Sequence, residues 1–215
     1  MTAGHIIIAL NGEYQHEERL LLLAQEADGL IAADGGANWL VAHDLTPSLL
    51  VGDLDSVRPL LLADLRQRGV AVEQHSPRKD ATDAELALLR AVEMGATRIT
   101  LIGALGGRID HALGNIGLLA LPGLECRDVA IFDGLSWLRL VRQEIVLRGQ
   151  PGDTVSLIPW GGDAEGIVTE GLEYPLRGET LQLGPARGVS NVMTASTARV
   201  SLCGGALLVI HTPQA

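Results

Sequence analysis

The sequence predicts an α/β domain with a parallel sheet, followed by an all-β domain. As far as about residue 134, short apolar runs alternate with segments of helical periodicity. That alternation is typical of a parallel sheet covered by helices on both faces. Beyond about residue 140, short strand-like runs are separated by Gly, Pro and Asp, which is typical of an antiparallel sandwich or flattened barrel. We therefore expect a Rossmann-like domain over residues 1–137 and a β-rich domain over residues 138–215.

The expected elements follow one another in βα order within the first domain. Strands are expected at residues 5–10, 29–33, 48–51, 70–75, 98–102 and 128–132. Helices are expected at residues 17–27, 37–44, 57–68, 82–94 and 111–121. Gly69 and Gly95 mark two helix ends, where glycine commonly caps the C-terminus. Thr82 and Glu85 have the spacing of a capping box, which predicts a helix beginning there. In the second domain we expect strands at residues 154–158, 166–169, 180–183, 199–202 and 206–211.

The composition argues against several classes of protein. The formal net charge of −10 argues against a nucleic-acid partner, which normally meets a basic surface. The chain has no apolar run of the roughly 18 residues that a membrane span needs, and its first residues lack the basic region of a signal peptide. Cys126 and Cys203 are not spaced like metal ligands, so we expect buried free thiols in a reducing cytoplasm.

Acidic residues follow the ends of predicted strands. Asp34 follows one strand, Asp53 and Asp55 follow the next, and Asp83 opens a helix. In an open parallel sheet the ligand crevice lies at the carboxyl ends of the strands, so these carboxylates are expected to share one edge. Clustered carboxylates repel one another unless a cation lies between them, and Mg²⁺ is commonly held by one or two carboxylates plus substrate phosphates. Taken singly, each Asp is also an ordinary turn or helix-start residue.

Cationic and glycine residues lie beside the acidic ones. Lys79 precedes Asp80, and the run Gly106-Gly107-Arg108 lies between a predicted strand and helix. Glycines let backbone N–H groups approach a phosphate, and arginine binds it with two donors, although a flexible turn with a surface arginine fits equally well. Neither a P-loop nor a dinucleotide-binding glycine motif occurs. Together with the carboxylates, these residues predict an enzyme that moves phosphate groups.

In these motifs the chain resembles the thiamine pyrophosphokinase family. The matching runs in the first domain are residues 34–38, 52–56, 79–85 and 106–111 with Asn115. Those in the second are residues 156–159, 169–176, 188–191 and 204–209. The resemblance covers nearly the whole chain in the same motif order, with Leu54 standing where the family often has an aromatic residue.

The resemblance implies an activity and a set of site residues. It implies an ATP-binding and Mg²⁺-binding catalytic domain, a thiamine-binding β domain, and a homodimer with active sites between subunits. ATP and thiamine would give thiamine diphosphate and AMP. The implied metal ligands are Asp53, Asp55 and Asp83, and the implied catalytic residues are Asp55, Lys79, Asp80 and Arg108. The implied substrate-binding and phosphate-binding residues are Asp34, Gly35, Gly36, Asn38, Thr82, Gly107, Asp110, His111, Asn115, Ser190 and Asn191.

Some assignments stay open at this stage. Asp34 and Asp80 are second choices, either as metal ligands or as groups that orient Lys79 and metal-bound water. Trp160 fits stacking on the cationic thiamine ring or packing in the β domain. A pterin pyrophosphokinase would keep the acidic runs, but residues 169–176 and 188–191 favour thiamine. A non-catalytic sensor has no need of the full acidic and basic set, and a generic α/β protein without a site does not explain the combined motifs.

Overall fold

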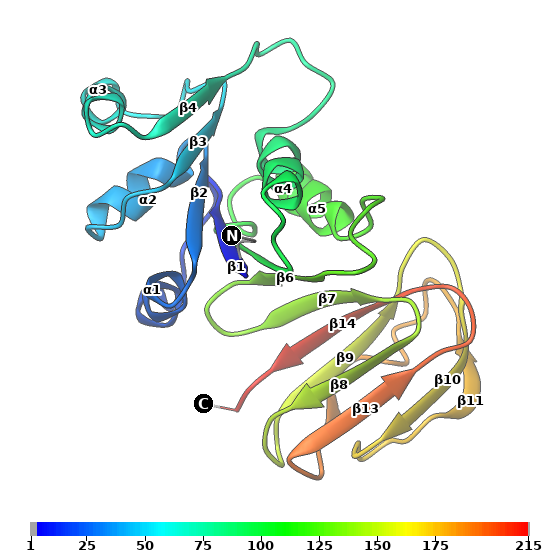
Figure 1. The fold of residues 1–215 in the computed structure, drawn as a ribbon. Coiled ribbons are helices and arrows are strands. Elements are labelled where there is room, and N and C mark those ends of the chain that lie inside the picture. The colour runs from blue at the N-terminus through cyan, green and yellow to red at the C-terminus, as the bar shows by residue number, and fades with distance from the viewer. Residues whose placement is uncertain (1–3, 215) are drawn as a thin grey trace. The chain divides into compact units, whose positions relative to one another are not determined.

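The computed structural model describes residues 4–214 and divides into two compact units, residues 1–134 and residues 135–215. Figure 1 shows a sheet with helices in the first unit and strands alone in the second. The predicted fold class, a parallel α/β domain followed by an antiparallel β domain, is confirmed. Within the described residues, no helix combines the length and apolar character needed to cross a membrane.

The first unit is built on six parallel strands in the order β6-β5-β1-β2-β3-β4. The strands are β1 (His5–Ala9), β2 (Gly29–Ala33), β3 (Leu49–Gly52), β4 (Ala71–Gln74), β5 (Arg98–Ile102) and β6 (Asp128–Phe132). Ile6, Ile7 and Ile8 of β1 are all fully buried, because helices cover both faces of a central parallel strand.

Five helices cover this sheet. They are α1 (Glu17–Gln25), α2 (Gly36–Ala42), α3 (Pro59–Gln67), α4 (Asp83–Glu93) and α5 (Ile109–Leu118). Helices α1, α2 and α3 lie on one face, and α4 and α5 lie on the other (Figure 1). The chain moves outward from β1 through β2, β3 and β4 and then returns to β5 on the other side of β1. This reversal of direction between β1 and β5 is the point at which open α/β sheets bind ligands.

The strands of the second unit form two antiparallel sets of four. One has the order β12-β9-β14-β7 and the other the order β11-β10-β13-β8. The strands are β7 (Trp137–Val141), β8 (Glu144–Arg148), β9 (Thr154–Pro159), β10 (Ala164–Glu170), β11 (Arg177–Leu181), β12 (Asn191–Val192), β13 (Thr197–Ser201) and β14 (Leu207–Thr212). Alternate residues of β9 are buried, and side chains of both sheets form one apolar cluster. The unit is therefore a sandwich.

The structure differs from the sequence-based expectation in some strands of the second unit, where β12 was also not expected, and in the exposure of the cysteines. Strands β7 and β8 lie in a stretch for which no strand was expected, and they belong to different sheets, β7 pairing with β14 and β8 with β13. The cysteines are free as expected, but Cys126 and Cys203 are exposed, so the expectation that they are buried was wrong.

Candidate functional site

A cavity of about 670 Å³ lies at the carboxyl ends of the strands in the first unit. Its walls come from the segments after β1, β2, β3 and β5 and from the start of α4. These are the strands on either side of the reversal in strand order, so the position agrees with the ligand crevice of open α/β sheets. The volume is within the range of small-molecule sites.

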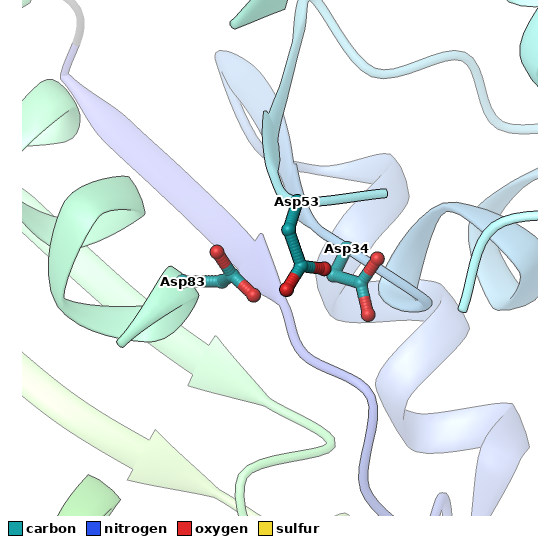
Figure 2. A group of neighbouring side chains, drawn as sticks. All are labelled: Asp34, Asp53 and Asp83. Atoms are coloured by element: carbon teal, nitrogen blue, oxygen red, sulfur yellow. The ribbon is translucent and has the colours of Figure 1, made fainter. Parts of the chain in front are cut away.

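Three carboxylates converge in this cavity. Asp34, Asp53 and Asp83 each offer one oxygen, and these oxygens all lie within 4.8 Å of one another. Figure 2 shows the side chains arriving from three separate segments: the end of β2, the end of β3 and the first residue of α4. We call these residues the acidic triad.

The backbone around Gly52 brings the triad together. Gly52 has a φ of 148°, and a Cβ there would lie 3.1 Å from both Asp34 Cβ and Asp83 Cγ. Asp34 itself has a φ of 47°, an uncommon conformation for a residue other than glycine. Because residue 52 has no side chain, Asp34 and Asp83 can both lie close to its backbone.

Asp34 is the most buried member of the triad, with 7% of its surface exposed. Its Oδ1 accepts a hydrogen bond of 3.3 Å from the backbone N–H of Ser56. Burial raises the pKa of Asp34, and hydrogen bonds from Ser56 and Gly35 partly offset that effect. A buried carboxylate facing two others is more stable with a cation between them.

Asp83 has an oxygen that lacks a hydrogen bond. Its Oδ1 is buried, and the Nζ atom of Lys79 lies 2.9 Å away as an ion pair without hydrogen-bond geometry. Three carboxylate oxygens within 4.8 Å of one another suit a hard cation such as Mg²⁺, which binds oxygen ligands.

Asp55 and Asp80 are not members of the triad. Asp55 is exposed and lines the cavity, and its Oδ1 accepts a hydrogen bond of 2.8 Å from the Ser56 hydroxyl. Leu54, which has a φ of 68°, separates it from Asp53, and the Asp55 backbone N–H donates to Asp53 Oδ1 at 3.3 Å. Asp80 is exposed and does not line the cavity.

The glycine–arginine run lines another part of the cavity. Gly106 and Gly107 have φ values of 81° and 63°, and both line the cavity with Arg108. Arg108 is exposed and makes a two-pronged ion pair with Asp110, with distances of 3.1 and 2.5 Å. This pair lowers the pKa of Asp110 to about 2. The guanidinium is therefore at the cavity but engaged by a neighbour.

Other predicted site residues of the first unit divide into those lining the cavity and those supporting it. Thr82, His111 and Asn115 line it; Thr82 also caps α4, and the Asn115 amide donates to the Ala104 carbonyl. Gly35, Gly36 and Asn38 do not line it. Asn38 instead holds the loop after β3, donating to the Ser56 carbonyl at 2.8 Å and accepting from Arg58. Gly36 packs against the Ala9 carbonyl with no room for a Cβ.

Sequence reasoning missed the segment after β1. Asn11, Gly12 and Glu13 line the cavity, although no role was expected for them. The signal that could have identified them is their position directly after a predicted strand, the criterion that selected Asp34 and Asp53.

Ser190 and Asn191 lie in the second unit. Ser190 has a φ of 61°, and its backbone N–H donates to the Ser156 hydroxyl at 3.0 Å. The buried Asn191 side chain bonds the backbone of Tyr174 twice, accepting from its N–H at 3.0 Å and donating to its carbonyl at 2.8 Å. Tyr174 is 64% exposed, so Asn191 fixes the backbone beneath an outward-facing aromatic ring.

Comparison with known proteins gives one consistent result for both units. The sequence-family model of the thiamin pyrophosphokinase catalytic domain matches residues 20–129. The family model of the thiamin pyrophosphokinase vitamin B1 binding domain matches residues 142–207. Thiamine pyrophosphokinase from Bacillus subtilis is 27% identical over 85% of this chain and 86% of its own length. Thiamine pyrophosphokinase 1 from Oryza sativa is 29% identical over 93% and 84%. The crystal structure of the Bacillus subtilis protein covers 98% of this chain and 100% of its own, with 26% identity and a TM-score of 0.87.

Proposed function

The chain belongs to the thiamine pyrophosphokinase family, whose enzymes convert thiamine to thiamine diphosphate, and from that premise we propose the chemical route and the residues that serve it. ATP donates its diphosphate to the thiamine hydroxyl. The hydroxyl oxygen attacks the β-phosphorus, the bond from that phosphorus to the α–β bridging oxygen breaks, and AMP leaves. The hydroxyl proton passes to a nearby base or to water. The products are thiamine diphosphate and AMP.

The single observation that carries the site assignment is the acidic triad, whose three carboxylate oxygens lie within 4.8 Å of one another. We propose that Asp34, Asp53 and Asp83 hold Mg²⁺. When bound, the ion would neutralise charge on the phosphate oxygens. Asp55 lies beside the triad in the same cavity, and we propose it as the weak base that receives the thiamine proton. Asp80 would orient Lys79, its neighbour in the chain.

The cationic groups would bind phosphate oxygens. Lys79 is paired with Asp83, and Arg108 is paired with Asp110. A cation between the triad carboxylates would neutralise the negative charge of Asp83, which Lys79 now balances. The Lys79 ammonium group would then be free to bind the polyphosphate. The Gly107 amide is a further donor at the cavity wall, and backbone N–H groups of this kind commonly bind phosphate. Catalysis of this type depends mainly on positioning and charge stabilisation.

Thiamine would be bound with help from the second unit. Ser190 and Asn191 are the proposed residues, and their observed contacts favour a supporting role for Asn191, whose amide is occupied by the Tyr174 backbone. We also propose a homodimer with active sites between subunits and a cytoplasmic location. The exposed apolar side chains of α5 support self-association, since Ile109 is 76% and Leu113 is 58% exposed.

The route is tested by incubating the purified protein with ATP, Mg²⁺ and thiamine and separating the products by chromatography. Equimolar AMP and thiamine diphosphate, both lost on adding EDTA, are the expected result. ADP with thiamine monophosphate would overturn attack at the β-phosphorus. AMP formed only with a pterin alcohol would move the substrate assignment, and turnover unaffected by EDTA would contradict the metal.

A further inference from the structure

The segment after β1 is fixed against the segment after β5. The Gly12 N–H donates to the Gly103 carbonyl at 2.9 Å, and the Glu13 N–H donates to the Leu105 carbonyl at 3.0 Å. Tyr14 secures the same segment, because its hydroxyl donates to the Leu10 carbonyl and its ring stacks on Trp39 with centroids 4.4 Å apart. The backbone of Glu13 is therefore held at the point where the strand order reverses.

The Glu13 side chain lies across the glycine loop, residues 106–107. Its Oε1 accepts a hydrogen bond of 3.1 Å from the Gly107 backbone N–H. A Cβ added to Gly106 would lie 2.6–2.8 Å from the Cβ, Cγ and Cδ atoms of Glu13, so the side chain is in close contact with that glycine. An internal carboxylate thus occupies the amide that we assign to a substrate phosphate.

A carboxylate and a phosphate oxygen compete for one donor, and both are negative. Four other carboxylates line the cavity, from Asp34, Asp53, Asp55 and Asp83. Three of these form the acidic triad, whereas Glu13 bonds the neutral backbone amide of Gly107. Glu13 is exposed and its backbone is fixed, so rotation of the side chain alone moves the carboxylate into water.

We propose that Glu13 is an internal competitor of the nucleotide: its carboxylate holds the Gly107 amide in the free protein, and the polyphosphate of ATP must displace it. This proposal rests on the proposed function, because it takes the ligand of the cavity to be a polyphosphate. Glu13 would thereby set nucleotide affinity without taking part in the reaction. One exposed hydrogen bond of this kind corresponds to about a two- to tenfold change in affinity.

The experiment measures binding of α,β-methylene ATP, whose α–β bridge cannot be cleaved, by calorimetry with Mg²⁺ and without thiamine. Glu13→Ala removes both charge and hydrogen bond, and Glu13→Gln removes the charge but keeps an acceptor. We expect tighter binding in both variants, about two- to tenfold for alanine and less for glutamine. Glu18→Gln is the matched control, since Glu18 is exposed on α1, outside the cavity lining, and undergoes the same change in charge.

The possible outcomes distinguish failure of the Glu13 proposal from failure of the proposed function. Weaker binding in Glu13→Ala, with Glu13→Gln near the wild type, would show that Glu13 ties the loop in its binding shape and would overturn competition. If Glu18→Gln binds the nucleotide analogue equally more tightly, the gain in affinity comes from the net charge of the protein, and competition by Glu13 is also contradicted. No nucleotide binding by the wild-type protein would contradict the proposed function itself.

Discussion

The acidic triad is tested most directly by removing the charge of a single carboxylate. Asp53→Asn replaces one carboxylate oxygen with an amide and removes the charge, while the shape of the side chain stays nearly the same. Because Asp53 lies within 4.8 Å of both other triad oxygens, we expect turnover to fall by several orders of magnitude. Steady-state formation of AMP measures this, and circular dichroism checks the fold. Asp64→Asn is the control, since Asp64 is a partly exposed residue of α3 paired with Arg68. Near-normal turnover in Asp53→Asn would remove Asp53 from the metal site.

The roles of Asp34 and Asp55 can also be separated residue by residue. The sequence favoured Asp55 as a metal ligand, whereas the described geometry groups Asp34 with Asp53 and Asp83. We therefore expect Asp34→Asn to weaken Mn²⁺ binding, measured by electron paramagnetic resonance without nucleotide. Asp55→Asn should leave that binding within a few-fold of the wild type and lower turnover. Loss of Mn²⁺ binding in Asp55→Asn alone would restore the sequence-based ligand set.

A buried carboxylate in the second unit links stability to pH. Asp153 accepts hydrogen bonds from the backbone N–H groups of Gln150 and Gln214 and from His211. Burial by itself would raise the pKa of Asp153, but these hydrogen bonds hold it below its ordinary value of 3.8. The folded state therefore binds the proton less readily than the unfolded chain. Stability from Asp153 is fully present above the ordinary pKa and is lost as pH falls through the lower folded value.

Asp153→Asn should reproduce much of that loss at neutral pH. An amide nitrogen in place of either oxygen would face donors already present, so we expect a cost of about 1–3 kcal/mol in the free energy of unfolding. Urea unfolding at pH 7 and at about pH 2.5 measures it, and the difference between variant and wild type should shrink at the lower pH, which lies below the ordinary pKa of the carboxyl. Asp163→Asn is the control, because Asp163 also accepts a backbone N–H but is exposed. An unchanged midpoint in Asp153→Asn would contradict the prediction.

Among the elements, α4 connects a helix cap to the site. The Thr82 hydroxyl accepts a hydrogen bond of 3.2 Å from the Glu85 N–H, and the next residue, Asp83, belongs to the triad. Thr82→Ala should cost about 1 kcal/mol in unfolding free energy. It should also weaken Mn²⁺ binding, because the first turn of α4 would hold Asp83 less firmly. Thr82→Ser keeps the hydroxyl and should behave like the wild type. If the serine and alanine variants lose the same stability and Mn²⁺ affinity, the helix cap is not the cause of the loss.

Elements and site were predictable from the sequence to different degrees. Alternating apolar runs and the Thr82 cap predicted the βα order, because these signals are local. Strands β7 and β8 carry no turn glycine between them and pair with distant strands, so local signals did not predict them. The inclusion of Asp34 in the triad depends on its positive φ and on close packing at Gly52, which no spacing in the sequence expresses.

For the whole molecule, the decisive question is what covers α5. Among the described residues, this helix is mostly apolar but has no fully buried residue. Its apolar side chains, Ile109 and Leu113 among them, are therefore accessible to water in the single chain. We expect the protein to be a dimer and Leu113→Asp to shift it toward monomer, since a charge would be buried in the interface. Sedimentation velocity over a range of concentrations measures this. Leu60→Asp is the control, because Leu60 is 88% exposed on α3.

The same pair of variants bears on where the active site is built. If the active sites lie between subunits, Leu113→Asp should lose turnover in parallel with the dimer, and high protein concentration should restore part of both. A monomeric Leu113→Asp with full turnover would contradict active sites between subunits. A dimer that survives this substitution while Leu60→Asp dissociates would move the interface from α5 to the other face of the sheet.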